Sequence, residues 1–240
     1  MKFIKLFEEQ TAFDEAKSTL NRPNVSLIKT NRKVYSLTEE GGVNANGYSY
    51  VDLGLPSRLK WAKYNVGAEK ETDAGLYFAW GETTGYTASQ VGTDKQFSWS
   101  DYKYGNSSSN LTKYNQSDGK TVLESTDDAA SQIMGGDWRM PTQNELLELY
   151  NNTTRSWVTI NGVNGRKFTS KKDTSKYIFI PAAGYYYNGS VSEVGNNGYI
   201  WSSTISSPYN NARFLKFKAT TCSASTTERC YGMSVRGVKM

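Results

Sequence analysis

Two cysteines, Cys222 and Cys230, are the residues whose chemistry is easiest to define, because the 240-residue chain holds no histidine. Without histidine there is no Ser-His-Asp or Cys-His nucleophile and no histidine-ligated zinc or haem. The two thiols cannot complete a zinc site alone, so they are either free thiols or one local disulfide. We expect no cofactor and no enzymatic activity.

Carboxylates are the second candidate for chemistry. Asp127, Asp128 and Asp137 lie close together in the sequence. An oxygen-rich cation site needs more convergent ligands than this spacing provides. Asp127 and Asp128 also stand at the start of a predicted helix over DDAASQIM, where the helix dipole favours negative charge. We therefore predict no metal, and the sequence selects no pair of acids for glycoside cleavage.

Charge and hydropathy indicate whether nucleic acid or a membrane is an expected partner. The 28 Lys and Arg residues against 23 Asp and Glu leave a net charge of +5, but the basic residues are scattered along the chain. This pattern does not favour nucleic-acid binding. The opening MKFIKLFEEQ reaches Glu8 after a few apolar residues and lacks the apolar stretch of a signal peptide. No segment is long and apolar enough to cross a bilayer, so we expect synthesis in the cytoplasm without membrane insertion.

Residues 1–40 predict a small βαββ module. Residues 2–7 suit a strand, TAFDEAKSTL has an apolar face at helical spacing, and NVSLI and KVYSL flank the turn-prone KTNR. A piece of this size carries little stability alone, so we expect it to dock on the rest of the chain or on another subunit. GGVNANG, residues 41–47, has the glycine and asparagine density of a linker.

Residues 48–240 predict one larger domain. Strand-like runs are separated by Gly, Asn, Ser and Asp, and these runs are YSYVDLG, LKWAKYNVG, GLYFAWGET, YIFIPAAG, GYIWSST, ARFLKFKA and GMSVRGV. Only two helices are convincing, the one over DDAASQIM and one beginning at Thr142, which with Glu145 has the spacing of a capping box. Many irregular strands with two helices predict the α+β class. Residues 211–236 are predicted to form a strand, a polar loop and a strand, and we expect the loop to be the functional surface of the domain.

Seven motifs of this larger domain occur in an order that resembles a known family. They are YVDLGLPSRLKWAKYNVGA, LYFAWGET, FSWSDYKY, DDAASQIMGGDWRMPTQNELLEL, FIPAAGY, GYIWSST and GMSVRGV. Residues 48–240 resemble a C-type-lectin-like domain that is duplicated in gut Bacteroidetes and their phages. That domain belongs to the fold group of formylglycine-generating enzyme and of the variable proteins of diversity-generating retroelements. The opening FIKLFEEQTAFDEA with RPNVSLI is similar to openings of phage and prophage structural proteins from the same hosts.

The resemblance implies that the C-terminal strands and loops carry diversified residues that face a ligand. The composition from Tyr185 onward agrees, because tyrosines supply large contacts while Ser, Asn, Gly and Thr supply adaptable hydrogen bonds. At least one tyrosine of the triplet 185–187 must face the core, since a strand alternates its faces. Four residues are predicted to face inward: Trp201, Leu215, Phe217 and Val235. The candidate ligand-binding residues are Tyr187, Ile200, Tyr209, Asn210, Asn211, Arg213, Phe214, Lys216, Lys218, Thr220, Thr221, Cys222, Ser223, Thr227, Arg229, Cys230 and Tyr231.

A non-enzymatic binding protein is the function that the resemblance implies. The N-terminal module would attach it, in several copies and as a possible homo-oligomer, to other subunits of a phage or prophage particle. The C-terminal surface would bind an unknown cell-surface protein or glycan. The calcium tripeptides EPN, QPD and WND of sugar-binding C-type lectins are absent, so calcium-dependent sugar binding is not implied.

Two alternatives remain open. One is a fixed adhesin or structural decoration domain without diversification. The other is a copper-dependent oxidase of the formylglycine-generating type, which binds copper through two cysteines late in the fold. Seven residues separate Cys222 and Cys230, where that enzyme has four, so this resemblance is weak.

Overall fold

The computed structural model describes residues 42–43 and 46–240. These residues are mostly β, with 38% in strands and 11% in helices. The expected fold class, an α+β domain of C-type-lectin-like form behind a βαββ module, is therefore wrong. Both predicted α-helices are present, as α2 (Ala129–Met134) and α3 (Gln143–Asn152), but they are short. Residues 1–40, which were assigned to the βαββ module, lie outside the described residues.

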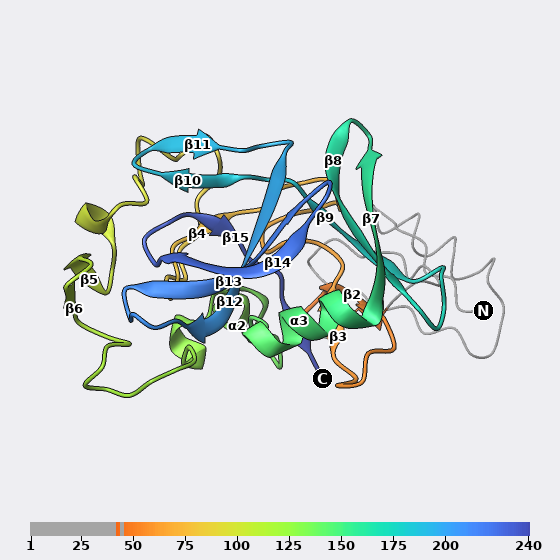
Figure 1. Cartoon of the computed structure of the whole chain (residues 1–240), viewed down its shortest axis with the longest axis horizontal. Coiled ribbons are helices and arrows are strands. Elements are labelled where there is room, and N and C mark those ends of the chain that lie inside the picture. Colours follow the sequence, from red (N-terminus) through yellow and green to blue (C-terminus); the bar gives the residue numbers. More distant parts are fainter. Residues whose placement is uncertain (1–41, 44–45) are drawn as a thin grey trace, which may run out of the picture.

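The largest sheet holds five strands in the order β14-β13-β12-β15-β4 and occupies the centre of the molecule (Figure 1). Strands β12, β13 and β14 follow one another as antiparallel neighbours, and β15 joins β12 in parallel. The bounds are β4 (Tyr77–Phe78), β12 (Asn197–Ile205), β13 (Asn211–Lys218), β14 (Cys222–Glu228) and β15 (Met233–Ser234).

Smaller sheets surround this centre. One has the order β1-β2-β3-β16, another the order β7-β8-β9, and the pairs β5-β6 and β10-β11 stand alone. Within the expected linker, Gly42–Val43 form β1 and pair with Ser49 and Tyr50 of β2. The bounds are β1 (Gly42–Val43), β2 (Ser49–Asp52), β3 (Lys60–Ala62), β5 (Gly105–Ser107), β6 (Asn110–Leu111), β7 (Thr153–Ile160), β8 (Val163–Ser170), β9 (Tyr177–Pro181), β10 (Tyr185–Tyr187), β11 (Ser190–Ser192) and β16 (Val238–Lys239), with short 3-10 helices η1 (Trp99–Asp101) and η2 (Ser125–Asp127).

Each strand-like run of the sequence contains a strand, but several further strands, among them β14 and the β7–β8 hairpin, were not predicted. The segment expected as a polar loop forms β14, because Ser and Thr suit an edge strand that needs no apolar alternation. The β7–β8 hairpin turns at Asn161 and Gly162, whose φ angles are 47° and 82°. Asn-Gly between apolar-containing runs is a strong hairpin signal, so the sequence did carry this information.

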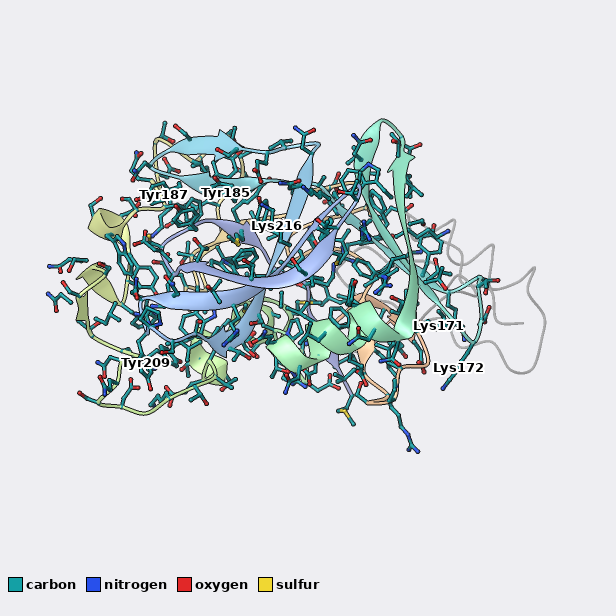
Figure 2. All side chains as sticks on the ribbon, in the orientation of Figure 1. Lys171, Lys172, Tyr185, Tyr187, Tyr209 and Lys216 are labelled. Carbon is teal, nitrogen blue, oxygen red and sulfur yellow. The ribbon has the colours of Figure 1, made fainter. Side chains whose placement is uncertain are left out.

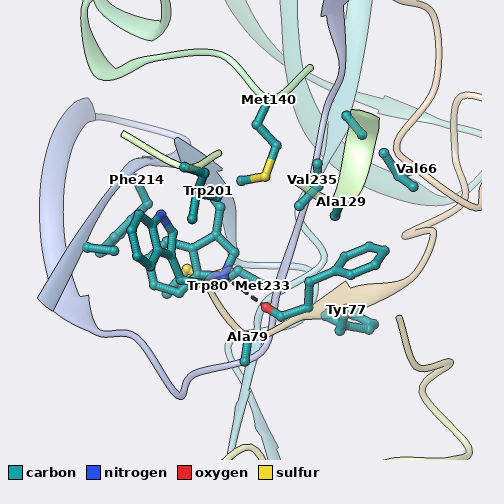
Figure 3. Close-up of a cluster of buried hydrophobic side chains, with 14 of the residues drawn as sticks. Val66, Tyr77, Ala79, Trp80, Ala129, Met140, Trp201, Phe214, Met233 and Val235 are labelled. Atoms are coloured by element: carbon teal, nitrogen blue, oxygen red, sulfur yellow. Dashed lines mark hydrogen bonds between the residues drawn. The ribbon is translucent and has the colours of Figure 1, made fainter. Parts of the chain in front are cut away.

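Two hydrophobic clusters form the core, and β13 separates them. Phe214 belongs to the first cluster, which also holds Trp80 and Trp201, and these three lie together in Figure 3. Leu215 belongs to the second cluster, where Leu146 of α3 covers the opposite face of the sheet. The four residues predicted to face inward, Trp201, Leu215, Phe217 and Val235, are all fully buried. Strand β13 is therefore buried on both faces over its central part.

The two α-helices begin as the sequence predicts. Thr142 and Glu145 form the expected capping box at the start of α3, and Arg139 forms an ion pair with Glu145 at 2.6 Å. Asp128 caps α2 by accepting a hydrogen bond from the Ser131 backbone N–H at 2.9 Å. Among the described residues, no helix is long and apolar enough to cross a membrane.

Candidate ligand-binding surface

Four tyrosines from three segments meet on one side of the central sheet. The ring of Tyr187 stacks on that of Tyr231 with centroids 4.3 Å apart, and Tyr185 lies 5.5 Å from Tyr231. Tyr185 also meets Tyr199 of β12 edge-on at 5.2 Å. Tyr199 is buried and forms the floor, whereas the other three rings are half-buried. This arrangement presents aromatic surface on a fixed support.

An ion pair borders the tyrosines. The Lys216 ammonium lies 3.7 Å from the Glu193 carboxylate and 5.2 Å from the centroid of the Tyr199 ring. The Glu193 carboxylate also accepts hydrogen bonds from the Tyr199 hydroxyl and from the Asn197 side-chain amide. Glu193 has a φ of 63°, a left-handed conformation that is uncommon for a residue with a side chain. We call the group Tyr185, Tyr187, Tyr199, Tyr231, Glu193 and Lys216 the tyrosine surface.

Strand alternation decides which other candidates share this side. Lys216 pairs with Ser223 on β14 and with Tyr199 on β12, so all three point to the same face. Lys218, Ser225 and Thr227 follow at intervals of two and lie on that face as well. Arg213, a candidate ligand-binding residue, lies on the opposite face with Leu215 and Phe217 and therefore does not share the face of Lys216. Thr220 and Thr221 are exposed in the turn between β13 and β14.

Five candidates are buried, and this corrects their prediction as ligand contacts. Ile200, Phe214 and Cys222 are at most 9% exposed, and Arg229 and Cys230 are 0% exposed. The reason for Ile200 and Phe214 is that β12 and β13 have core on both faces, so neither set of alternate residues is wholly free. Cys222 is buried because the start of β14 packs in the second cluster. They maintain the shape of the surface from below.

Arg229 is held inside the protein by backbone carbonyls. Its guanidinium donates hydrogen bonds to the carbonyls of Lys113 at 3.1 Å and Tyr114 at 2.9 Å. It also lies 5.5 Å from the Trp80 ring and 5.3 Å from the Tyr102 ring. Burial lowers the pKa of this guanidinium. Arg229 therefore ties the end of β14 to the loop that precedes η2.

The two cysteines are free thiols and lie far apart. Cys222 begins β14, and Cys230 follows the end of it. The strand alone spans about 20 Å at the usual rise per residue, so the predicted alternative of a local disulfide is wrong. Cys222 packs in the second cluster and Cys230 in the first. This separation also prevents the two sulfurs from sharing one copper ion.

Tyr209 and its neighbours stand apart from the tyrosine surface. In Figure 2, Tyr209 lies at a distance from Tyr185, Tyr187 and Lys216, which are close to one another. Tyr209, Asn210 and Asn211 are half-buried at the turn that joins β12 to β13. The Asn210 carbonyl accepts the Arg229 backbone N–H at 3.0 Å. The candidate residues therefore divide into two groups at different ends of the sheet.

The three aspartates considered for a metal have different partners. Asp127 accepts hydrogen bonds from Tyr104, from Tyr114 at 2.7 Å and from Lys113 at 2.5 Å. Asp128 accepts from the backbone of Ser131 and of Met140, and Asp137 lies 3.2 Å from Lys239. Within the described part of the chain, no group of three acidic, cysteine or histidine residues is placed to hold a metal ion.

The structure adds three residues to the candidates: Tyr185, Glu193 and the buried Tyr199. Tyr185 follows from the alternation of the triplet, in which Tyr186 is buried against Tyr77 with centroids 4.6 Å apart, so that Tyr185 and Tyr187 share the other face. No pattern in the sequence indicates that Glu193 belongs to this surface, because its position depends on the turn between β11 and β12.

Comparison with known proteins gives one match. A family described as a domain of unknown function, DUF8237, matches residues 149–238. No curated protein and no solved structure matches the chain. The matched range includes the whole tyrosine surface and all of β12, β13 and β14.

Proposed function

We propose that the protein is a non-enzymatic binding protein whose tyrosine surface contacts a cell-surface protein or glycan. The observation that carries this proposal is the half-buried row of Tyr185, Tyr231 and Tyr187 above a buried floor. Aromatic side chains give large contact area at low cost in side-chain entropy. Serine and threonine of β14, beside Lys216, supply adaptable hydrogen bonds at the rim.

The distribution of burial supports variation at this surface. On β14, Ser223 is exposed and Ser225 and Thr227 are half-buried, while the strand itself is held by backbone pairing to β13. A backbone ladder does not depend on side-chain identity, so these positions tolerate substitution at little cost in stability. The resemblance to variable proteins of diversity-generating retroelements motivates the same proposal, with display on a phage or prophage particle.

The binding test uses the full chain, fluorescently labelled, on intact gut Bacteroidetes cells and on a glycan array. We expect binding to at least one cell strain or glycan, and a loss of at least about tenfold for Tyr187→Ala and Tyr231→Ala, which are central aromatic contacts. Tyr64→Ala, a half-buried tyrosine in another part of the molecule, is the matched control and should bind as wild type. Equal binding by all three variants would contradict the proposal.

A genetic test addresses diversification separately. The 3′ end of the gene and its flanking DNA are sequenced deeply in a population, to find a near-copy that differs only at template adenines. We expect substitutions at Tyr187, Lys216 and the outward residues of β14, and none at Phe214 or Leu215. Substitutions spread evenly over buried and exposed positions would indicate ordinary drift and favour the fixed adhesin.

A further inference from the structure

Strand β14 forms one edge of the five-stranded sheet. It is seven residues long, CSASTTE, and has no proline, no lysine and a single charge at its end. Natural proteins usually protect exposed edges with such residues, because an unpaired edge is a template for another strand. The side chains of β14 are small, so a second backbone can approach closely.

The backbone groups that point outward follow from the turn before β14. The Lys218 N–H donates to the Thr221 carbonyl at 2.9 Å, which makes these two residues a hydrogen-bonded pair. Pairs alternate along an antiparallel ladder, so Ser223 and Ser225 direct their backbone groups to β13, and Ala224 and Thr226 direct theirs away from it. Across residues 42–43 and 46–240, no backbone or side-chain group is hydrogen-bonded to the outward N–H or C=O of these two residues.

Opposite charges lie at the two ends of β14, a carboxylate of the strand itself at one end and guanidinium groups of β7 and β8 at the other. Glu228 ends the strand, and no ion pair joins it to a base in the described part of the chain. At the other end, the Arg166 guanidinium donates to the carbonyls of Lys218 at 2.6 Å and Ala219 at 3.1 Å, in the turn that leads to Cys222. Burial raises the pKa of the Cys222 thiol to about 11, and the positive charges of Arg166 and Arg155 oppose this rise. Neither arginine has an acidic partner among the described residues.

We propose that β14 pairs antiparallel with β14 of a second copy of this chain, with the two-fold axis at Ser225. In this register Ala224 of each copy faces Thr226 of the other, and both present their outward backbone groups. Glu228 of each copy faces Cys222 of the other, beside Arg166 and Arg155. In this register the outward backbone N–H and C=O groups of the edge find hydrogen-bond partners. It also brings Glu228 of each copy close to the arginines of the other, and it places no like charges opposite each other.

The dimer also has a consequence for the proposed function. The two-fold axis of an antiparallel pair is perpendicular to the sheet, so both copies present the same face on the same side. Two tyrosine surfaces would then face one target, and weak single sites would gain from avidity. The pairing itself does not rest on the proposed function, because it is a property of the edge alone.

Sedimentation velocity of the full chain tests the pairing, at concentrations from about 5 to about 200 µM, which suits an interface below the standard size. We expect a species of twice the 26.8 kDa chain mass. Thr226→Pro removes an outward donor without touching the ladder to β13, since edge strands accept proline where the N–H faces away. It should weaken association at least about tenfold, because each dimer loses two hydrogen bonds. Thr226→Val keeps the N–H and is the matched control that should still associate.

A charge test uses different residues. Glu228→Lys places a third positive group beside Arg166 and Arg155, and it should weaken association most strongly at low salt. Glu69→Lys makes the same change of charge at an exposed position outside β14 and should have no effect. A monomer throughout the concentration range, or a dimer that Thr226→Pro and Glu228→Lys leave unchanged, would overturn the proposal. Circular dichroism of each variant confirms that it is folded.

Discussion

The ring of Tyr187 lies parallel to that of Tyr231, with 16° between the planes and 4.3 Å between the centroids. The contact joins β10 to the turn after β14. Aromatic pairs are worth about 0.5–1.5 kcal/mol beyond their buried area. A double-mutant cycle with Tyr187→Ala and Tyr231→Ala, read by urea unfolding, is expected to return a coupling of that size. Strict additivity of the two single changes would show that the stacking carries no energy.

Neighbouring tyrosines of β10 are expected to differ sharply in their effect on stability. Tyr186 is 7% exposed and contacts Tyr77, whereas Tyr187 is half-buried. Tyr186→Ala should lower the free energy of unfolding by about 3–5 kcal/mol, as for other buried aromatic residues. Tyr187→Ala should lower it by only about 1–2 kcal/mol, because the half-buried Tyr187 side chain removes less apolar surface from water on folding. Similar losses for both would mean that Tyr187 is a core residue and not a ligand contact.

Arg236 is expected to be the most sensitive charged residue. It is 0% exposed, and its guanidinium donates to the carbonyls of Ala62, Lys63 and Phe179 and to the Asn65 side-chain oxygen. Arg236→Met should cost at least about 3 kcal/mol in the free energy of unfolding, because buried acceptors lose their donors.

Arg236→Lys should not restore this stability, because one ammonium cannot reach four separated acceptors. The measurement is guanidinium chloride unfolding of each variant. Arg155→Lys, at a half-buried position, is the control and should change the free energy of unfolding little. A stable Arg236→Lys protein would show that charge alone is needed at this position.

The Arg139–Glu145 ion pair predicts a pH dependence. Burial opposes the charged form of Glu145, but hydrogen bonds from Arg139 and Thr142 outweigh it, so the pKa of this carboxyl lies below its ordinary value. A lowered pKa in the folded state means that the stabilisation is present above the unfolded pKa and is lost as the pH falls through the folded one. Thermal unfolding should therefore show that wild type loses more stability than Glu145→Gln between about pH 5 and pH 3. An identical loss in both would remove Glu145 from the acid response.

Thiol reactivity provides a simple check of burial. Burial raises the pKa of the Cys222 thiol to about 11 and that of the Cys230 thiol to about 12. At pH 8 both are protonated, so native protein should react with 5,5′-dithiobis(2-nitrobenzoate) at least about a hundredfold more slowly than denatured protein. Cys222→Ser and Cys230→Ser identify which thiol accounts for any residual rate. Rapid labelling of Cys230 would contradict its position in the first cluster.

The sequence predicted local features of the fold better than its class. Thr142 with Glu145 identified the start of α3, because a capping box depends on residues three apart. The class was wrong because the two helices are short, and because strands such as β14 consist of Ser and Thr without apolar alternation. The face on which such a strand is buried depends on partners far away in the sequence, which a local pattern does not contain.

The candidate site was predicted in part for a similar reason. The tyrosines were recognisable by type, and Lys216 by its alternation with Leu215 and Phe217. Phe214 was misplaced because alternation assumes one buried face, and β13 has two. Arg229 was misplaced because an arginine is usually exposed, whereas here backbone carbonyls from a distant loop accept its hydrogen bonds.

The position of β13 between the two hydrophobic clusters has a consequence for how the domain unfolds. Phe214 and Leu215 are adjacent in the chain, yet each belongs to a different cluster. Neither cluster can lose its side chains to water without releasing the strand that the other one needs. Strand β12 joins them in the same way, because Trp201 belongs to the first cluster and Ile200 to the second. The two cores therefore behave as one cooperative unit and should melt in a single transition.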